Sequence, residues 1–107
     1  MLFRSHLNTL PKDNTVYGLI HQDAHGGNCL VDDKAIITLF DFDECAYSWY
    51  SNDIAIVLFY TVMDADDWPA FTQEFMIHFL RGYRQVYTLE PQWLQEIPHF
   101  LKLRELE

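Results

Sequence analysis

One loop and one strand end carry the residues of this chain whose types and spacing could do chemistry. Asn28 follows Asp23 by five residues, and two further acids, Asp41 and Asp43, come after the next apolar segment. In phosphoryl transfer, an aspartate at the first position accepts the proton of the attacking hydroxyl, while the asparagine and a later aspartate hold Mg²⁺. The spacing therefore makes Asp23 the candidate base and Asn28 and Asp41 the candidate metal ligands. Asp43 is a candidate for contact with the metal or a substrate amine.

Short apolar segments must position these residues. Residues 16–20 form an apolar run that predicts a strand, and residues 28–31 and 35–40 have the pattern of a hairpin with the polar residues 32–34 at its tip. Such a hairpin brings Asn28 and Asp41 to the same end, because one starts the outgoing strand and the other ends the return strand. Two residues that are distant in sequence could then share one metal ion.

The second half of the chain predicts helices. Ser51-Asn52-Asp53 is a helix-start signal for a buried helix over residues 51–63. A second helix is expected over residues 69–87 and a third region over 91–106, interrupted or restarted at Pro98. An aromatic and apolar stripe at helical spacing on the second helix is expected in the core. Its members are Phe71, Phe75, Phe79, Leu80, Tyr83 and Tyr87.

Three motifs in a fixed order resemble those of a known family. They are His21-Gln22-Asp23-Ala24-His25-Gly26-Gly27-Asn28, Phe40-Asp41-Phe42-Asp43 and Asp53-Ile54-Ala55. Together they resemble the catalytic centre of the aminoglycoside phosphotransferase-like (choline kinase-like) family, whose members are relatives of protein kinases. The chain departs from the family pattern at Gln22, usually glycine or another small residue, and at Ala24, usually leucine. Neither change removes a chemical role.

The resemblance implies a fold and a set of roles. The fold is α+β and mostly helical, part of the carboxy-terminal lobe of a kinase-like fold, with a small hairpin segment followed by about three helices. The activity is Mg²⁺- and ATP-dependent transfer of phosphate to a small hydroxyl compound. By resemblance, His21 bonds the loop backbone, Asp53 fixes the shape of the loop from a helix, and His25 is a candidate phosphate contact.

Parts of the family pattern are missing. The chain has four glycines, no G-x-G-x-x-G loop and no strand lysine of the Val-Ala-x-Lys type. We therefore expect one partial domain over residues 1–107, without the amino-terminal nucleotide lobe. Residues 1–15 are an approach segment, 16–44 carry the catalytic loop and hairpin, and 51–107 are helical. Alone, the chain is expected to be inactive.

Composition limits the partners. The net charge of −9 argues against nucleic acid, which needs basic patches, and suits a cationic substrate. No apolar leader is evident, and the strongly apolar run 54–63 is too short to span a bilayer. Cys29 and Cys45 suggest reduced packing cysteines in a cytoplasmic protein. The 16% aromatic content predicts exposed apolar surface that would meet another lobe or allow self-association.

Two other function classes stay open. A metal-dependent hydrolase could use His21, Asp23, His25 and Asp41, since His-x-Asp-x-His resembles ligand spacing. The chain could also be a non-catalytic folded module. The remaining histidines have no partner that the sequence identifies, and we expect them to be ordinary surface or core residues. They are His6, His78 and His99.

Overall fold

The structure is a computed structural model that describes residues 2–63 and 66–106, and helices make up most of its regular structure. The helices are α1 (Leu2–Asn8), η1 (Gly26–Asn28), α2 (Tyr50–Val62), α3 (Trp68–Tyr83), α4 (Pro91–Leu94) and α5 (Ile97–Leu106). The strands are β1 (Tyr17–Ile20), β2 (Cys29–Val31), β3 (Ile37–Leu39) and β4 (Ala46–Trp49). This is the α+β, mostly helical arrangement that the sequence predicts.

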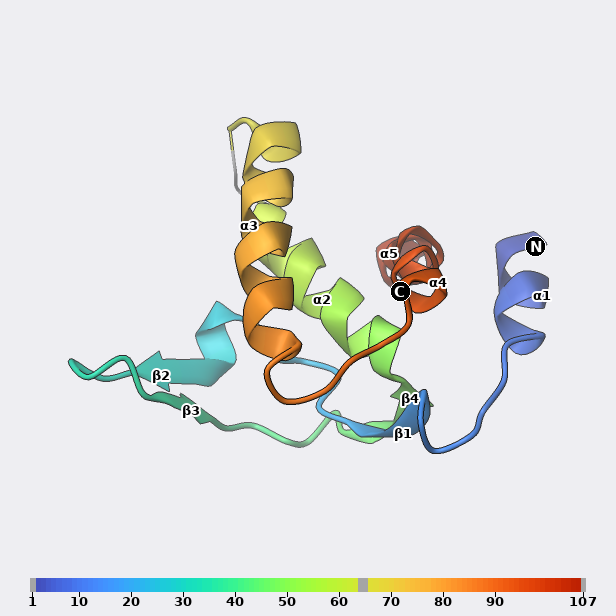
Figure 1. Ribbon diagram of the computed structural model, residues 1–107, viewed down its shortest axis with the longest axis horizontal. Helices are drawn as coiled ribbons and strands as arrows, with labels where there is room; N and C mark the ends of the chain where they lie inside the picture. Colours follow the sequence, from blue (N-terminus) through green and yellow to red (C-terminus); the bar gives the residue numbers. More distant parts are fainter. Residues whose placement is uncertain (1, 64–65, 107) are drawn as a thin grey trace.

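The strands form two separate antiparallel pairs. β1 pairs with β4, so that Ile20 lies opposite Ala46, and β2 pairs with β3, so that Cys29 lies opposite Leu39. The predicted strand at 16–20 and the predicted hairpin are therefore present, whereas β4 was not predicted. Figure 1 shows the β2–β3 hairpin extending away from the helices. Its apolar residues are exposed, with Leu30 at 65%.

A buried helix organises the core. α2 lies against α5 and also contacts α3, β1 and β4. Ile54 and Leu58, one turn apart on α2, are buried, and Phe100 of α5 is fully buried with its ring centroid 5.7 Å from that of Trp49. The buried core residues are Leu7, Val16, Ile54, Ala55, Leu58, Leu89, Trp93, Ile97 and Phe100. They come from both ends of the chain, so the core brings the first and last helices together.

The start of α2 differs in detail from the prediction. The helix begins at Tyr50, and its N-cap residue Trp49 makes no capping hydrogen bond with its side chain. The predicted capping residues have other partners: Ser51 Oγ donates to the carbonyl of Trp93, and Asn52 Nδ2 donates to Ser48 Oγ. These polar side chains join α2 to α4 and β4 instead of capping the helix.

The predictions for α3 were partly wrong. The helix ends at Tyr83, four residues before the predicted end, close to Gly82, which weakens a helix interior. Beyond it, the hydroxyl of Tyr87 donates to the carbonyl of Thr15, which ties this segment to the start of β1. Of the aromatic stripe, Phe75, Phe79 and Tyr83 pack against the core. Phe71 and Tyr87 are each 39% exposed and lie outside the core, although the Tyr87 ring packs edge-on against Tyr50.

Both ends of the chain contain structure that the sequence did not reveal. The approach segment holds α1, whose Leu7 is buried in the core. The break in the last helical region falls between α4 and α5, before Pro98, which lies in the first turn of α5 where a missing N–H costs little. His6 and His99, for which the sequence identifies no partner, both contact Glu96. None of the described helices has the length and apolar character needed to cross a membrane.

We predict that Phe100→Ala destabilises the fold by about 3–5 kcal/mol, the usual cost of removing a buried aromatic ring. Leu106→Ala, at an exposed position of the same helix, should change the free energy of unfolding by less than about 0.5 kcal/mol. Urea unfolding followed by circular dichroism measures both. Equal midpoints for the two variants would show that Phe100 is not central to the core.

Candidate active site

Asn28 organises the loop between β1 and β2. Its side chain is buried, and Nδ2 donates to the carbonyl oxygen and to Oδ2 of Asp23, both at 2.9 Å. Two acceptors on one side fix the orientation of the amide. Across residues 2–63 and 66–106, no donor reaches Asn28 Oδ1, so this oxygen is available to a cation.

The hairpin brings Asp41 beside this loop. The backbone N–H of Phe40 donates to the carbonyl of Asn28 at 3.1 Å, so the chain enters Asp41 directly next to the start of β2. Asp41 has a φ of 60°, in the left-handed region, which aspartate tolerates better than most residues. The side chains of Asp41 and Asp43 are exposed and make no hydrogen bond or ion pair with the described residues. The backbones of the two predicted metal ligands are thus neighbours, with the carboxylates open to solvent.

His21 joins the loop to the segment after β3. Its Nδ1 accepts from the N–H of Asp23 at 3.1 Å, so the proton of the neutral ring sits on Nε2, which donates to the carbonyl of Phe40 at 2.9 Å. The ring also packs against Phe42, with centroids 4.6 Å apart. Both ring nitrogens are therefore engaged with backbone groups.

Asp53 holds the other side of the loop. Its Oδ1 accepts from the N–H of Gln22 at 3.0 Å, from the first turn of α2. Gln22 has a φ of 69°, again in the left-handed region that favours glycine. This conformation explains why the resembling family usually has glycine or another small residue here. The carboxylate of Asp53 anchors a backbone conformation that glutamine would otherwise avoid.

The carboxylate of Asp23 is surrounded by groups from distant elements. His25 Nδ1 accepts from the N–H of Gly27, and its Nε2 lies 3.3 Å from Asp23 Oδ1. Arg104 of α5 places Nη2 at 3.8 Å from the same oxygen and donates to the hydroxyl of Tyr60 at 2.8 Å. The guanidinium also lies over the Tyr60 ring, which in turn packs against His25. Asp23 therefore faces a nearby positive charge in a mostly buried setting.

Sequence reasoning missed Arg104 and Tyr60. Tyr60 lies two helical turns after Asp53 on α2, a spacing that places both on the side of the helix nearest the loop and could have identified it. Nothing near Arg104 in sequence points to Asp23, because the contact depends on how α5 packs on α2.

Two cavities lie near these elements. One of about 380 Å³ is lined by Ala24, Cys29, Asp53 and Tyr83 together with apolar residues. Burial, and next the negative charge of Asp53, raise the pKa of the Tyr83 phenol, so it remains a hydrogen-bond donor. This cavity borders the loop that holds Asp23 and Asn28, since Ala24 and Cys29 line it.

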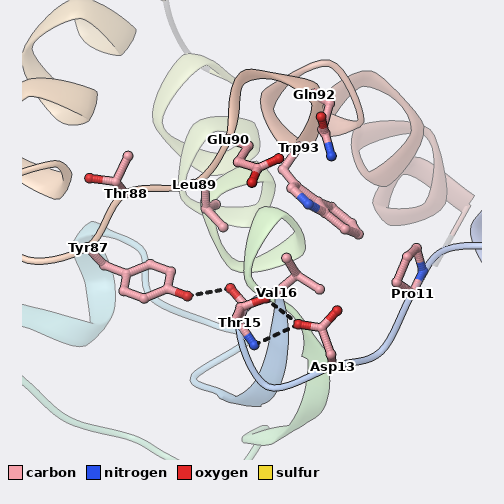
Figure 2. A pocket seen from close by; sticks show the side chains of 10 residues that line it. All are labelled: Pro11, Asp13, Thr15, Val16, Tyr87, Thr88, Leu89, Glu90, Gln92 and Trp93. Atoms are coloured by element: carbon pink, nitrogen blue, oxygen red, sulfur yellow. Dashed lines mark hydrogen bonds between the residues drawn. The ribbon is translucent and has the colours of Figure 1, made fainter.

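The other cavity, of about 230 Å³, contains none of the predicted site residues (Figure 2). It lies between the turn at Asp13 and the segment before α4. The hydroxyl and N–H of Thr15 donate to the Asp13 carboxylate and hold its pKa below the usual range. Asp13, Thr15 and Tyr87 thus bond to one another, and we assign this cavity no chemistry.

We predict different effects for two substitutions at Gln22. Gln22→Val should lower the stability by about 1–2 kcal/mol, because a β-branched residue tolerates a left-handed backbone poorly. Gln22→Gly, the matched control, should stay within about 1 kcal/mol of the parent, since relief of strain offsets the greater freedom of the unfolded chain. Thermal unfolding measures both. A valine variant that melts with the parent would contradict the strained loop.

Comparisons with known proteins agree with this geometry. Residues 2–93 match the phosphotransferase enzyme family. The chain is 49% identical over 104 residues to amicoumacin kinase of Bacillus subtilis (strain 168), an alignment that covers 94% of this chain and 31% of that protein.

Two solved structures are similar to this one. Amicoumacin kinase hAmiN in complex with AMP-PNP, Ca²⁺ and Ami has a TM-score of 0.93 and 42% identity, over 98% of this chain and 32% of that chain. The microcompartment-associated aminopropanol kinase has a TM-score of 0.77 and 30% identity over the same shares. The chain thus spans about a third of the length of these relatives and has the fold of the corresponding part of a kinase-like protein. The resemblance of its motifs is confirmed, and the chain belongs to the phosphotransferase enzyme family.

Proposed function

We propose that the chain carries the reaction centre of a Mg²⁺- and ATP-dependent kinase that phosphorylates a hydroxyl group of a small molecule. The observation that carries this proposal is the amide of Asn28, which binds Asp23 through its nitrogen and leaves its oxygen free. One residue thereby orients the base and offers a metal ligand.

Asp23 is the proposed catalytic base. The substrate hydroxyl would approach its carboxylate and pass its proton to an oxygen of Asp23 as phosphate is transferred. Asn28 and His25 fix the orientation of that carboxylate, and the guanidinium of Arg104 lies 3.8 Å from its Oδ1. His25 acts in this scheme as a positioning residue. Contact between His25 and a phosphate, which the sequence also suggested, would require Nε2 to leave Asp23.

The oxygen donors near the loop suit Mg²⁺, which prefers carboxylate and amide oxygens and retains several waters or phosphates. Asn28 Oδ1 and the Asp41 carboxylate would hold it, with Asp43 as an additional ligand or a contact for a substrate amine. When bound, the ion neutralises charge on the transferring phosphate. His21 and Asp53 are proposed to hold the loop in shape.

The hydrolase alternative is less well supported. It needs a free imidazole nitrogen on His21, but both nitrogens of that ring bind backbone groups of Asp23 and Phe40. A histidine held in this way is a poor metal ligand, because ligation would break one of the two hydrogen bonds that join the loop to the hairpin.

The exposed hairpin suggests where a nucleotide lobe would sit. Leu30 and Ile37 present apolar surface next to the candidate site. We propose that residues 1–107 form one partial domain whose hairpin packs against a nucleotide-binding lobe. Without that lobe, the exposed hairpin would allow only weak self-association, because the acids that flank it repel those of a second copy. The net charge of −9 favours a cationic acceptor. ATP use and reduced cysteines suit the cytoplasm.

The reaction can be tested in a chimera. This chain would replace the aligned third of B. subtilis amicoumacin kinase, and ADP release would be measured with ATP and amicoumacin. We predict turnover in the chimera and a loss of about 10²–10⁴-fold in Asp23→Asn, the usual contribution of a general base. Nucleotide affinity should stay within about twofold, because phosphate binding does not use Asp23.

Glu74→Gln is the matched control, since Glu74 is an exposed acid on α3, outside the loop and the hairpin. It should leave turnover unchanged. Full turnover in Asp23→Asn, with an active parent chimera, would refute the role of Asp23 as base.

The 107-residue chain alone should show no ADP release above background. Catalysis of phosphoryl transfer consists almost entirely of positioning and charge stabilisation, and the sequence has no glycine-rich loop or strand lysine to hold the phosphates. Calorimetry with AMP-PNP and Mg²⁺ should give weak binding at most. Tight binding together with Asp23-dependent turnover would contradict this expectation.

A further inference from the structure

A second cluster of chemically competent side chains lies away from the catalytic loop. Glu96 Oε2 lies 2.7 Å from His6 Nε2 and 3.0 Å from His99 Nδ1. The two imidazole centroids are 4.5 Å apart. All three donor atoms lie within 4.8 Å of one another, and no other such group of histidine, cysteine, aspartate or glutamate occurs in residues 2–63 and 66–106.

The fold builds this cluster from the two ends of the chain. Glu96 precedes α5 and His99 lies in its first turn, a spacing of three that puts both side chains on one face. His6 lies in the last turn of α1, which contacts α5 and whose Leu7 is anchored in the core. The convergence therefore depends on the packing of α1 against α5.

The donor set has a definite chemistry. Two imidazole nitrogens and one carboxylate oxygen suit borderline divalent ions such as Zn²⁺, whereas Mg²⁺ and Ca²⁺ prefer all-oxygen sites. Tetrahedral zinc holds its ligand atoms about 3.3 Å apart. The two distances from Glu96 Oε2, 2.7 Å to His6 Nε2 and 3.0 Å to His99 Nδ1, would therefore have to open by about 0.3–0.6 Å.

The side chains of this cluster are reachable from solvent, and a pocket lies beside them. The side chains of His6 and His99 are 42% and 41% exposed, while Glu96 is 18% exposed. Glu96 further lines a pocket of about 220 Å³ with Leu10 and Trp93. A water or a small ligand could occupy the fourth position of the ion from this side.

We propose that His6, Glu96 and His99 bind a divalent transition-metal ion of the zinc type, which clamps α1 to α5. The proposal is independent of phosphoryl transfer. The competing interpretation is a clamp of hydrogen bonds alone, in which Glu96 holds both imidazoles and no metal binds.

Zinc titration of the 107-residue chain separates the two interpretations. Calorimetry with ZnCl₂ in a buffer with excess Mg²⁺ should give one site, and zinc should raise the melting temperature. His6→Gln and His99→Gln should each weaken zinc binding by at least about tenfold, because a three-ligand site loses one donor. Both positions are partly exposed, so glutamine should fold there.

His78→Gln is the matched control, because His78 is an exposed histidine on α3 outside the cluster. The zinc affinity of the His78→Gln variant should equal that of the parent chain within about twofold. The cysteines are the same in all variants, so zinc bound by thiols cancels in the comparison. No zinc binding by the parent, or equal affinity in the parent and both cluster variants, would overturn the proposal and leave the hydrogen-bonded clamp.

Discussion

The backbone of Phe40 holds the candidate active site together. Its N–H donates to the carbonyl of Asn28, and its carbonyl accepts from His21 Nε2. Both polar groups of a single residue are thus bound by the two ends of the catalytic loop. The next residue is Asp41, so this pair of hydrogen bonds fixes where the second candidate metal ligand leaves the hairpin. Without them, the loop and the aspartate would belong to independent segments, because the two strand pairs share no hydrogen-bonded strand.

Two helices, α2 and α5, also contact this loop. α2 supplies Asp53, which binds the N–H of Gln22, and Tyr60, which lies between His25 and Arg104. α5 supplies Arg104 and packs on α2 through Phe100. The hydrophobic core and the electrostatic surroundings of Asp23 are therefore products of one packing arrangement. A change that shifts α5 relative to α2 would alter the charge next to Asp23, the proposed base, even though it touches no residue of the loop.

Local signals in the sequence were sufficient for the loop, the hairpin and the approximate helices, because spacing, turn residues and apolar runs act over a few residues. They also led to Asn28 and Asp53, whose contacts lie within recognisable motifs. Arg104, Tyr60 and β4 were missed because their roles depend on contacts between elements far apart in the chain. The contact of His6 was missed for the same reason, since Glu96 lies 90 residues away. His99 is only three residues from Glu96, so its partner lay within reach of a local reading. The end of α3 was placed too late because the stripe of aromatic residues continues past the last hydrogen-bonded turn.

The projecting β2–β3 hairpin has a consequence for the colloidal behaviour of the chain. It has two open strand edges and apolar side chains on both faces, which are the properties that promote edge-to-edge aggregation. Acids flank it at both ends: Asp32 and Asp33 stand at its tip, and Asp41 and Asp43 stand at its base. Flanking charges of one sign make two such hairpins repel each other before their strands can pair. The same carboxylates proposed to attract a metal ion would thus also keep the chain dispersed, and divalent cations that neutralise them would bring it closer to precipitation.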